Sequence, residues 1–90
     1  MAIERKPSVH IIIKGNVQGV SFRYFTLKQA QELNLFGWVQ NKPNGTVEVD
    51  AQGDKINLER FIKILQQGPS FSRVDDVTLN WEHPKKDYTD

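Results

Sequence analysis

The residues best suited to chemistry lie in the nine-residue stretch 15–23, with the sequence GNVQGVSFR. Its glycines, Gly15 and Gly19, lie between an apolar segment and a segment with helical periodicity. Glycine permits backbone conformations in which several N–H groups converge, and a helix N-terminus adds unpaired N–H groups and the positive end of the helix dipole. Arg23 adds a planar, permanently charged guanidinium that matches a phosphate or a carboxylate. The stretch therefore predicts a binding site for a compact dianion.

A plain turn followed by a surface arginine is the competing interpretation. Glycine pairs are common in turns, and Arg23 can form an ion pair with Glu32 or with the polar C-terminal segment. Such exposed pairs contribute little to stability. The position of the stretch, between a strand and a helix with an arginine one turn on, strengthens the case for an anion site. Residues and spacing alone nevertheless favour the plain turn.

Asn41 is the second candidate, at the end of a predicted strand and just before the turn Lys42–Gly45. One interpretation is a turn residue whose side chain bonds to nearby backbone. The other interpretation is functional. The first helix directly precedes this strand, so the strand can lie beside the glycine stretch. A carboxamide there both donates and accepts hydrogen bonds, so it can hold a water molecule without being a strong base. In isolation, the residue pattern favours the turn residue, with the water-holding role as the alternative.

The other aromatic and acidic candidates receive structural assignments: Trp38, Trp81, Glu48, Asp50, Asp75 and Asp76. The tryptophans lie in alternating strands, so we expect amphipathic core residues rather than ligand-stacking residues. The two adjacent aspartates point to opposite faces of a strand, which argues against a paired acid and base. The two carboxylates of the third strand share one face, which we expect to be solvated.

Hydrophobic periodicity predicts the elements that must position these residues. The predicted strands are Val9–Lys14, Phe36–Asn41, Thr46–Ala51 and Val77–Trp81; the predicted helices are Phe22–Leu33 and a segment containing Leu58–Leu65. Asn34 and Gly68 end the two helices, and Asp54 or Asn57 caps the second. The order βαββαβ predicts an α+β, ferredoxin-like sandwich with two helices packed on one face of a mostly antiparallel sheet. That fold hosts many functions, so function must come from the site.

Composition narrows the function classes. The chain has 90 residues, a net charge of +1 and no cysteine, which predicts one domain over 1–90, with 1–7 as a flexible N-terminus and 83–90 as a polar tail. The near-neutral charge argues against nucleic-acid and membrane-surface partners. Its two histidines, His10 and His83, lack partners at metal-ligand spacing, so we expect no metal and no cofactor. With no secretory signal or membrane span, a cytoplasmic monomer is the expectation.

The motifs together resemble the acylphosphatase family. The matching segments are GNVQGVSFR, then Ala30, LNLFGWVQN, NGTVEV, AQG and GPSFSRV, over nearly the whole chain from Val9 to about Val77. The resemblance implies metal-free hydrolysis of the carboxyl–phosphate bond of small acyl phosphates, with inorganic phosphate or sulfate as competitive ligands. It implies that Arg23 binds the phosphoryl group and that Asn41 positions the attacking water. The phosphate loop that it implies comprises Gly15, Asn16, Val17, Gln18, Gly19 and Val20.

Two features depart from the family pattern. Asn16 replaces a basic residue that many members carry, which weakens the local field but leaves the backbone N–H in place. Members also usually finish with a short extra strand, and this chain has only Tyr88–Asp90 where that strand would begin. We expect a less protected sheet edge and lower stability as a result.

Two alternatives belong to other function classes. An RNA-recognition module shares the βαββαβ order but needs aromatic residues on its central strands. The segment Thr46–Ala51 has none and carries two carboxylates. A non-catalytic anion-binding or regulatory domain of the same fold is the other alternative, and the presence of both Arg23 and Asn41 argues against it.

Overall fold

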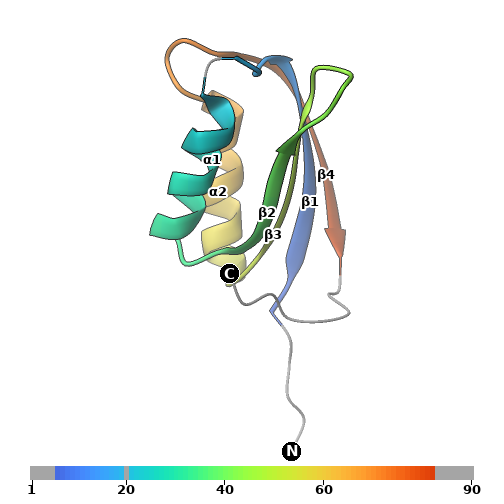
Figure 1. Cartoon of the computed structure of the whole chain (residues 1–90). Helices are drawn as coiled ribbons and strands as arrows, with labels where there is room; N and C mark the ends of the chain where they lie inside the picture. The colour runs from blue at the N-terminus through green and yellow to red at the C-terminus, as the bar shows by residue number, and fades with distance from the viewer. Residues whose placement is uncertain (1–5, 20, 83–90) are drawn as a thin grey trace, which may run out of the picture.

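The structure is a computed structural model that describes residues 6–19 and 21–82. Its elements are β1 (Ser8–Asn16), α1 (Phe22–Glu32), β2 (Phe36–Asn41), β3 (Val47–Gln52), α2 (Lys55–Gln67) and β4 (Arg73–Glu82). The strands form one sheet in the order β2-β3-β1-β4, and neighbouring strands pair antiparallel. Both helices cover the same face of this sheet (Figure 1). The predicted α+β, ferredoxin-like fold is confirmed.

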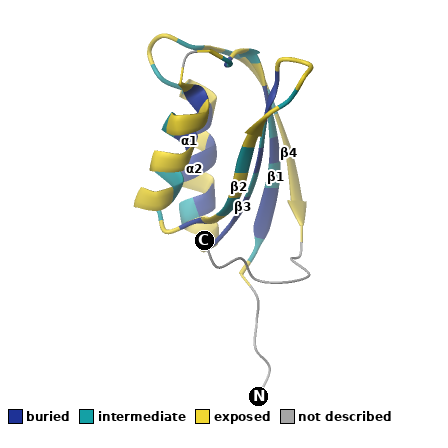
Figure 2. Cartoon of the chain, in the orientation of Figure 1, coloured by how far each residue is buried: buried dark blue, intermediate teal, exposed yellow. Residues whose placement is uncertain are grey.

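The core lies between the sheet and the two helices (Figure 2). Alternation along β1 directs Val9, Ile11 and Ile13 toward the helices, and all three are fully buried. They pair across the sheet with buried small and β-branched residues of β3. The helices contribute buried residues at helical spacing: Phe22, Leu58, Phe61, Ile62 and Leu65. Each such side chain stabilises the fold by about 1.5–3 kcal/mol relative to exposure.

The end of β1 differs from the prediction, which stopped the strand at Lys14. The strand continues through Gly15 and Asn16, which pair with Val74 and Arg73 of β4 after a register irregularity. Gly15 has φ +135°, and a Cβ there would lie 2.0 Å from the Arg73 carbonyl oxygen. Close approach of two backbones therefore requires glycine here, a need that the residue pattern did not reveal. Strand β3 is likewise shifted by one residue, to Val47–Gln52, and β4 begins earlier than predicted.

The assignment of both tryptophans to the core is wrong. Trp38 lies on the face without helices, 39% exposed, with its ring edge-on to the His10 ring at a centroid distance of 6.2 Å. Trp81 pairs with Val9 on the helix side of the sheet, yet it is 42% exposed. It lies on β4, the outer strand of the described sheet, where it borders an open cleft with Lys55 and Glu59 of α2. Alternation predicts the face of a residue but not how far the opposite layer extends.

The acidic residues of the strands do not form a catalytic pair. Asp75 and Asp76 are exposed on β4, as expected. Glu48 lies on the helix-free face, where its carboxylate contacts His10 Nε2 at 3.7 Å and Lys42 Nζ at 3.8 Å. Its side chain is only 17% exposed, so it is less solvated than predicted.

The ends of the described chain bear on two further expectations. Lys6 and Pro7 are attached to the fold, since their carbonyls accept hydrogen bonds from Gln52 Nε2 (3.1 Å) and Gly53 N–H (3.2 Å). The expectation of a polar tail that lacks a last strand concerns 83–90, which lie outside the described residues. Over 6–19 and 21–82, neither helix has the length and hydrophobicity needed to cross a bilayer.

Replacing Gly15 with alanine should destabilise the fold by more than about 2 kcal/mol, because φ is positive and the new Cβ meets a backbone carbonyl. Gly45→Ala is the matched control, since Gly45 has φ +90° but nothing within 4 Å of the added Cβ. That control should lose only about 1–2 kcal/mol, the conformational cost alone. Urea unfolding of both variants checks this, and equal losses would contradict the close approach.

Candidate active site

The glycine loop, the start of α1 and the end of β2 lie at the same end of the molecule (Figure 1). The short connection 33–35 reverses the chain, so α1 and β2 run in opposite directions. Arg23 is in the first turn of α1, and Asn41 is the last residue of β2. The two predicted side chains therefore belong to one end of the helix–strand pair.

The Gln18 side chain joins the glycine loop to the β2–β3 hairpin. Its Nε2 donates to the carbonyl oxygens of Lys42 and Thr46, both at 2.8 Å. Strand β3 separates β1 from β2, so strand pairing does not bring the loop and Asn41 together. The two Gln18 bonds connect them, because Lys42 directly follows Asn41. The sequence pointed to Gln18 only for its backbone N–H, and no local signal identifies the hairpin carbonyls as its partners.

Other loop residues are held in different ways. Val17 is 1% exposed and anchors the loop in the core. Gly19 is exposed at φ +76°, and Ser21 has φ +62°, which is uncommon for a residue with a side chain. Val20 lies outside the described residues. The turn proper therefore runs from Val17 to Ser21, since Gly15 and Asn16 belong to β1.

The start of α1 has none of the usual capping features. Ser21 makes no side-chain capping bond, and the first turn contains no acidic residue. The first-turn N–H groups of a helix have no intrahelical partners. Among the described residues, Phe25 N–H bonds to Ser21 O at 3.0 Å. Arg23 adds positive charge at the positive end of the helix dipole, which is unfavourable without a counter-ion. A bound anion would satisfy both the N–H groups and the arginine.

The Arg23 and Asn41 side chains are both exposed and without protein partners in the described part of the chain. Arg23 forms no ion pair there, so the alternative pairing with Glu32 is not formed. As a turn residue, Asn41 would bond to nearby backbone. Asn44 makes the bonds of this turn instead: its Oδ1 accepts from Thr46 N (3.1 Å) and from Thr46 Oγ1 (2.7 Å). Both candidate side chains are thus available to a ligand or to water.

A second arginine near the loop is already neutralised. Arg73 pairs with Asn16 across the sheet, and its guanidinium donates to both carboxylate oxygens of Asp75, at 2.9 and 3.2 Å. The hydrogen bond and the negative charge of Asp75 raise the pKa of Arg73 above its ordinary value. Arg73 is therefore engaged elsewhere, and Arg23 is the arginine free to meet an anion at this end. No group of three potential metal ligands occurs within residues 6–19 and 21–82.

Removing the Gln18 amide should weaken the link between the loop and the hairpin. Gln18→Met keeps the side-chain length but loses both 2.8 Å bonds. The two carbonyl oxygens keep their hairpin donors, Gly45 N–H on Lys42 O (3.0 Å) and Lys42 N–H on Thr46 O (2.9 Å). We expect a loss of about 1–3 kcal/mol in unfolding free energy. Gln40→Met is the matched control, because Gln40 makes one exposed bond to Glu48. Equal stability of the two variants would contradict the role of Gln18.

Comparison with known proteins places this arrangement in a family. A family model described as Acylphosphatase matches residues 9–90. The acylphosphatase of Bacillus licheniformis is 49% identical over 69 residues, which cover 77% of this chain and 77% of that protein. The acylphosphatase of Thermus thermophilus is 47% identical over 75 residues, covering 83% and 85%. A solved acylphosphatase from Coxiella burnetii superposes with a TM-score of 0.90 at 34% identity, covering 100% of this chain and 96% of that one. The chain belongs to the acylphosphatase family.

Proposed function

We propose that this chain is an acylphosphatase, which hydrolyses the carboxyl–phosphate bond of small acyl phosphates to a carboxylate and inorganic phosphate. One observation carries the proposal: the uncapped, electropositive start of α1 and the unpartnered Asn41 carboxamide lie at the same end of the fold. Family membership supplies the reaction class. The structural observation alone fits any site that binds a dianion. Family membership supports a site that also hydrolyses its ligand.

The roles of the residues follow from the charge of the substrate. Backbone N–H groups of the phosphate loop Gly15–Val20 and of the first turn of α1 bind the phosphoryl oxygens. Arg23 neutralises the charge on those oxygens, and Asn41 holds a water molecule in line with the bond to be broken. The water oxygen bonds to phosphorus, the bond from phosphorus to the acyl oxygen breaks, and the water proton passes to phosphate or solvent.

No general acid, strong base or metal is required for this reaction. The leaving group is a carboxylate, which departs without protonation. Phosphoryl transfer through a loose transition state needs positioning and charge neutralisation more than proton transfer. An array of fixed N–H groups and one guanidinium supplies both.

The test is hydrolysis of benzoyl phosphate and acetyl phosphate by the purified chain. Turnover with inorganic phosphate or sulfate as a competitive inhibitor supports the proposal. Phosphate binding without turnover would instead favour a non-catalytic anion-binding domain of the same fold.

Chelation should leave the rate unchanged. After dialysis against EDTA, we expect kcat/KM for benzoyl phosphate within about 2-fold of the untreated value, because the chemistry proposed needs no Lewis acid. A loss that added Mg²⁺ or Zn²⁺ restores would contradict the metal-free mechanism. Adding each ion to the untreated protein is the control for inhibition by the metal itself.

We also propose that the protein acts as a cytoplasmic monomer. The net charge of +1 and the absence of cysteine support this. Light scattering after size-exclusion chromatography tests the oligomeric state. A dimer at micromolar concentration would contradict it.

A further inference from the structure

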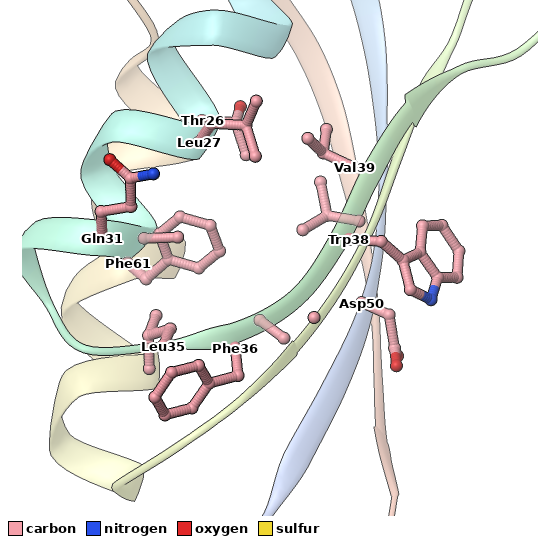
Figure 3. A pocket seen from close by; sticks show the side chains of 13 residues that line it. Thr26, Leu27, Gln31, Leu35, Phe36, Trp38, Val39, Asp50 and Phe61 are labelled. Atoms are coloured by element: carbon pink, nitrogen blue, oxygen red, sulfur yellow. The ribbon is translucent and has the colours of Figure 1, made fainter. Parts of the chain in front are cut away.

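A groove lies between α1 and β2 (Figure 3). Its volume is about 100 Å³. The residues that shape it are Thr26, Leu27 and Ala30 on α1, Gly37 and Val39 on β2, and Phe61 on α2. Neither the phosphoryl group nor the water of the proposed reaction occupies this groove, so its occupant needs a separate explanation.

The helix wall of the groove begins at Arg23. Thr26, Leu27 and Ala30 follow Arg23 by three, four and seven residues. Residues at this spacing lie on one face of a helix, in line along its axis. The arginine assigned to the phosphoryl group therefore stands at the head of the helix face that lines the groove.

The strand wall begins at Asn41 in the same way. Val39 and Gly37 precede Asn41 by two and four residues, and alternate residues of a strand share a face. That face is the helix side, since Gly37 and Val39 pair with the buried Ala51 and Val49 of β3. From Asn41 to Gly37 the wall extends about 13 Å at the rise of a strand. Both walls thus lead away from the two residues assigned to the reaction.

Small residues create the hollow. Ala30 on the helix faces a sheet surface where Gly37 and Ala51 are cross-strand partners. Gly37 has φ +145°, and a Cβ at this position would lie 1.8 Å from the Asp50 carbonyl oxygen. Close approach of β2 to β3 therefore requires glycine, so the groove borders a position of β2 that carries no side chain.

Most residues that line the groove are apolar, and Gln31 of α1 adds a carboxamide to the lining. The Thr26 hydroxyl donates to the Phe22 carbonyl at 2.9 Å, so it does not need a ligand or a water. The side chains of Trp38 and Asp50 point away from the gap between α1 and β2 (Figure 3). Leu27 is 40% exposed, although it is a large apolar side chain. The free energy of the system falls when hydrocarbon displaces water from such a surface.

We propose that this groove binds the hydrocarbon part of the acyl group, and that the enzyme prefers acyl phosphates with an apolar body longer than acetyl. The inference rests on the proposed function, because the phosphoryl end must be held at Arg23 and Asn41 for the acyl end to enter. The substrate is charged at one end and apolar at the other, and the site has the same division. A closed cavity of roughly 150 Å³ holds a benzene ring, so a groove of this size, open on one side, accommodates a chain of several methylene groups.

Each methylene group that enters the groove should raise kcat/KM by about 2- to 4-fold, the upper value corresponding to complete removal from water. The gain should appear mainly as a lower KM, because the chain contacts the groove equally in the ground state and in the transition state. From acetyl phosphate to hexanoyl phosphate we expect a rise of at least 10-fold for the natural chain.

The test compares acetyl, butanoyl and hexanoyl phosphate in three variants. Ala30→Leu fills the hollow and Leu27→Gln makes one wall polar, and both residue types are good helix formers. Each should lower the hexanoyl-to-acetyl ratio of kcat/KM by about 10-fold. Lys28→Gln, on an exposed residue of α1 that does not line the groove, is the matched control and should keep the natural ratio.

A ratio near one in the natural chain, or a ratio that Ala30→Leu leaves unchanged, would overturn the inference. Failure of the natural chain to hydrolyse acetyl phosphate would instead overturn the proposed function. A binding experiment separates the two, since it needs no turnover. Hexylphosphonate should shift the NMR signals of the Leu27 and Val39 methyl groups and methylphosphonate should not; equal effects of the two phosphonates would also overturn the inference.

Discussion

Replacing Arg23 with glutamine is expected to lower kcat/KM for benzoyl phosphate about 10³-fold. Among residues 6–19 and 21–82, Arg23 is the arginine at this end without a protein partner, since Arg73 pairs with Asp75, and the change removes its guanidinium. Loss of a single fixed donor typically costs about 10²–10³-fold, and loss of an arginine at a transferring phosphoryl group about 10³–10⁵-fold. Initial rates over a range of substrate concentrations give the result.

The same substitution should leave the fold slightly more stable in a buffer without phosphate. Arg23 lies at the positive end of α1 with no acidic residue in the first turn, so its removal relieves an unfavourable charge interaction. We expect a gain of about 0.3–1 kcal/mol in unfolding free energy. Inorganic phosphate should then raise the Tm of the natural chain but not that of the variant, because only the natural chain binds it.

Arg60→Gln is the matched control for this prediction. Arg60 is an exposed arginine on α2, so the variant loses the same unit of charge at another place. It should keep both the rate and the response of the Tm to phosphate. Turnover by Arg23→Gln at the natural rate would contradict the role of Arg23, and an equal loss in both variants would assign the effect to net charge.

The sequence predicted the fold well because the fold depends on patterns that are local. Alternation in Val47–Gln52 and helical spacing in Leu58–Leu65 are visible in the residues, and they set which faces meet in the core. Trp38 was misplaced because it lies on the helix-free face of the sheet. Trp81 was misplaced because its exposure depends on how far the helix layer reaches, and nothing near it in the sequence encodes that. The extension of β1 was missed for a similar reason: it is set by β4, distant in the sequence.

For the candidate site, the sequence predicted residues and roles, which stay predictions, but not the contacts that hold those residues in place. Types and spacing pointed to Arg23 and Asn41, and the family resemblance gave them roles. The Gln18 bonds to the hairpin carbonyls depend on a contact between segments 24 and 28 residues apart. Asn41 makes no turn bonds because Asn44 makes them. The residue pattern alone did not show which of the two asparagines would bond to the turn. Contacts of this kind appear only when distant segments are placed together.

Replacing Asn41 with alanine should lower kcat for benzoyl phosphate about 10²-fold while the inhibition constant of inorganic phosphate stays within about 2-fold. The carboxamide is proposed to orient the attacking water, and misplacement of a reactant by about 1 Å is enough for such a loss. Phosphate is held by the N–H groups and Arg23, which the variant retains. Steady-state kinetics with phosphate as a competitive inhibitor measure both quantities in one series.

The fold should tolerate this change, because the exposed Asn41 side chain makes no hydrogen bond among the described residues. Its loss should alter the unfolding free energy by no more than about 0.5 kcal/mol. Asn80→Ala, at an exposed asparagine of β4, is the matched control and should keep the natural kcat. If Asn41→Ala loses phosphate inhibition together with turnover, Asn41 holds the phosphoryl group rather than the water. If Asn41→Ala keeps both turnover and phosphate inhibition, another group orients the water. The assignment of phosphate binding to the helix start and of water positioning to the end of β2 would then be wrong.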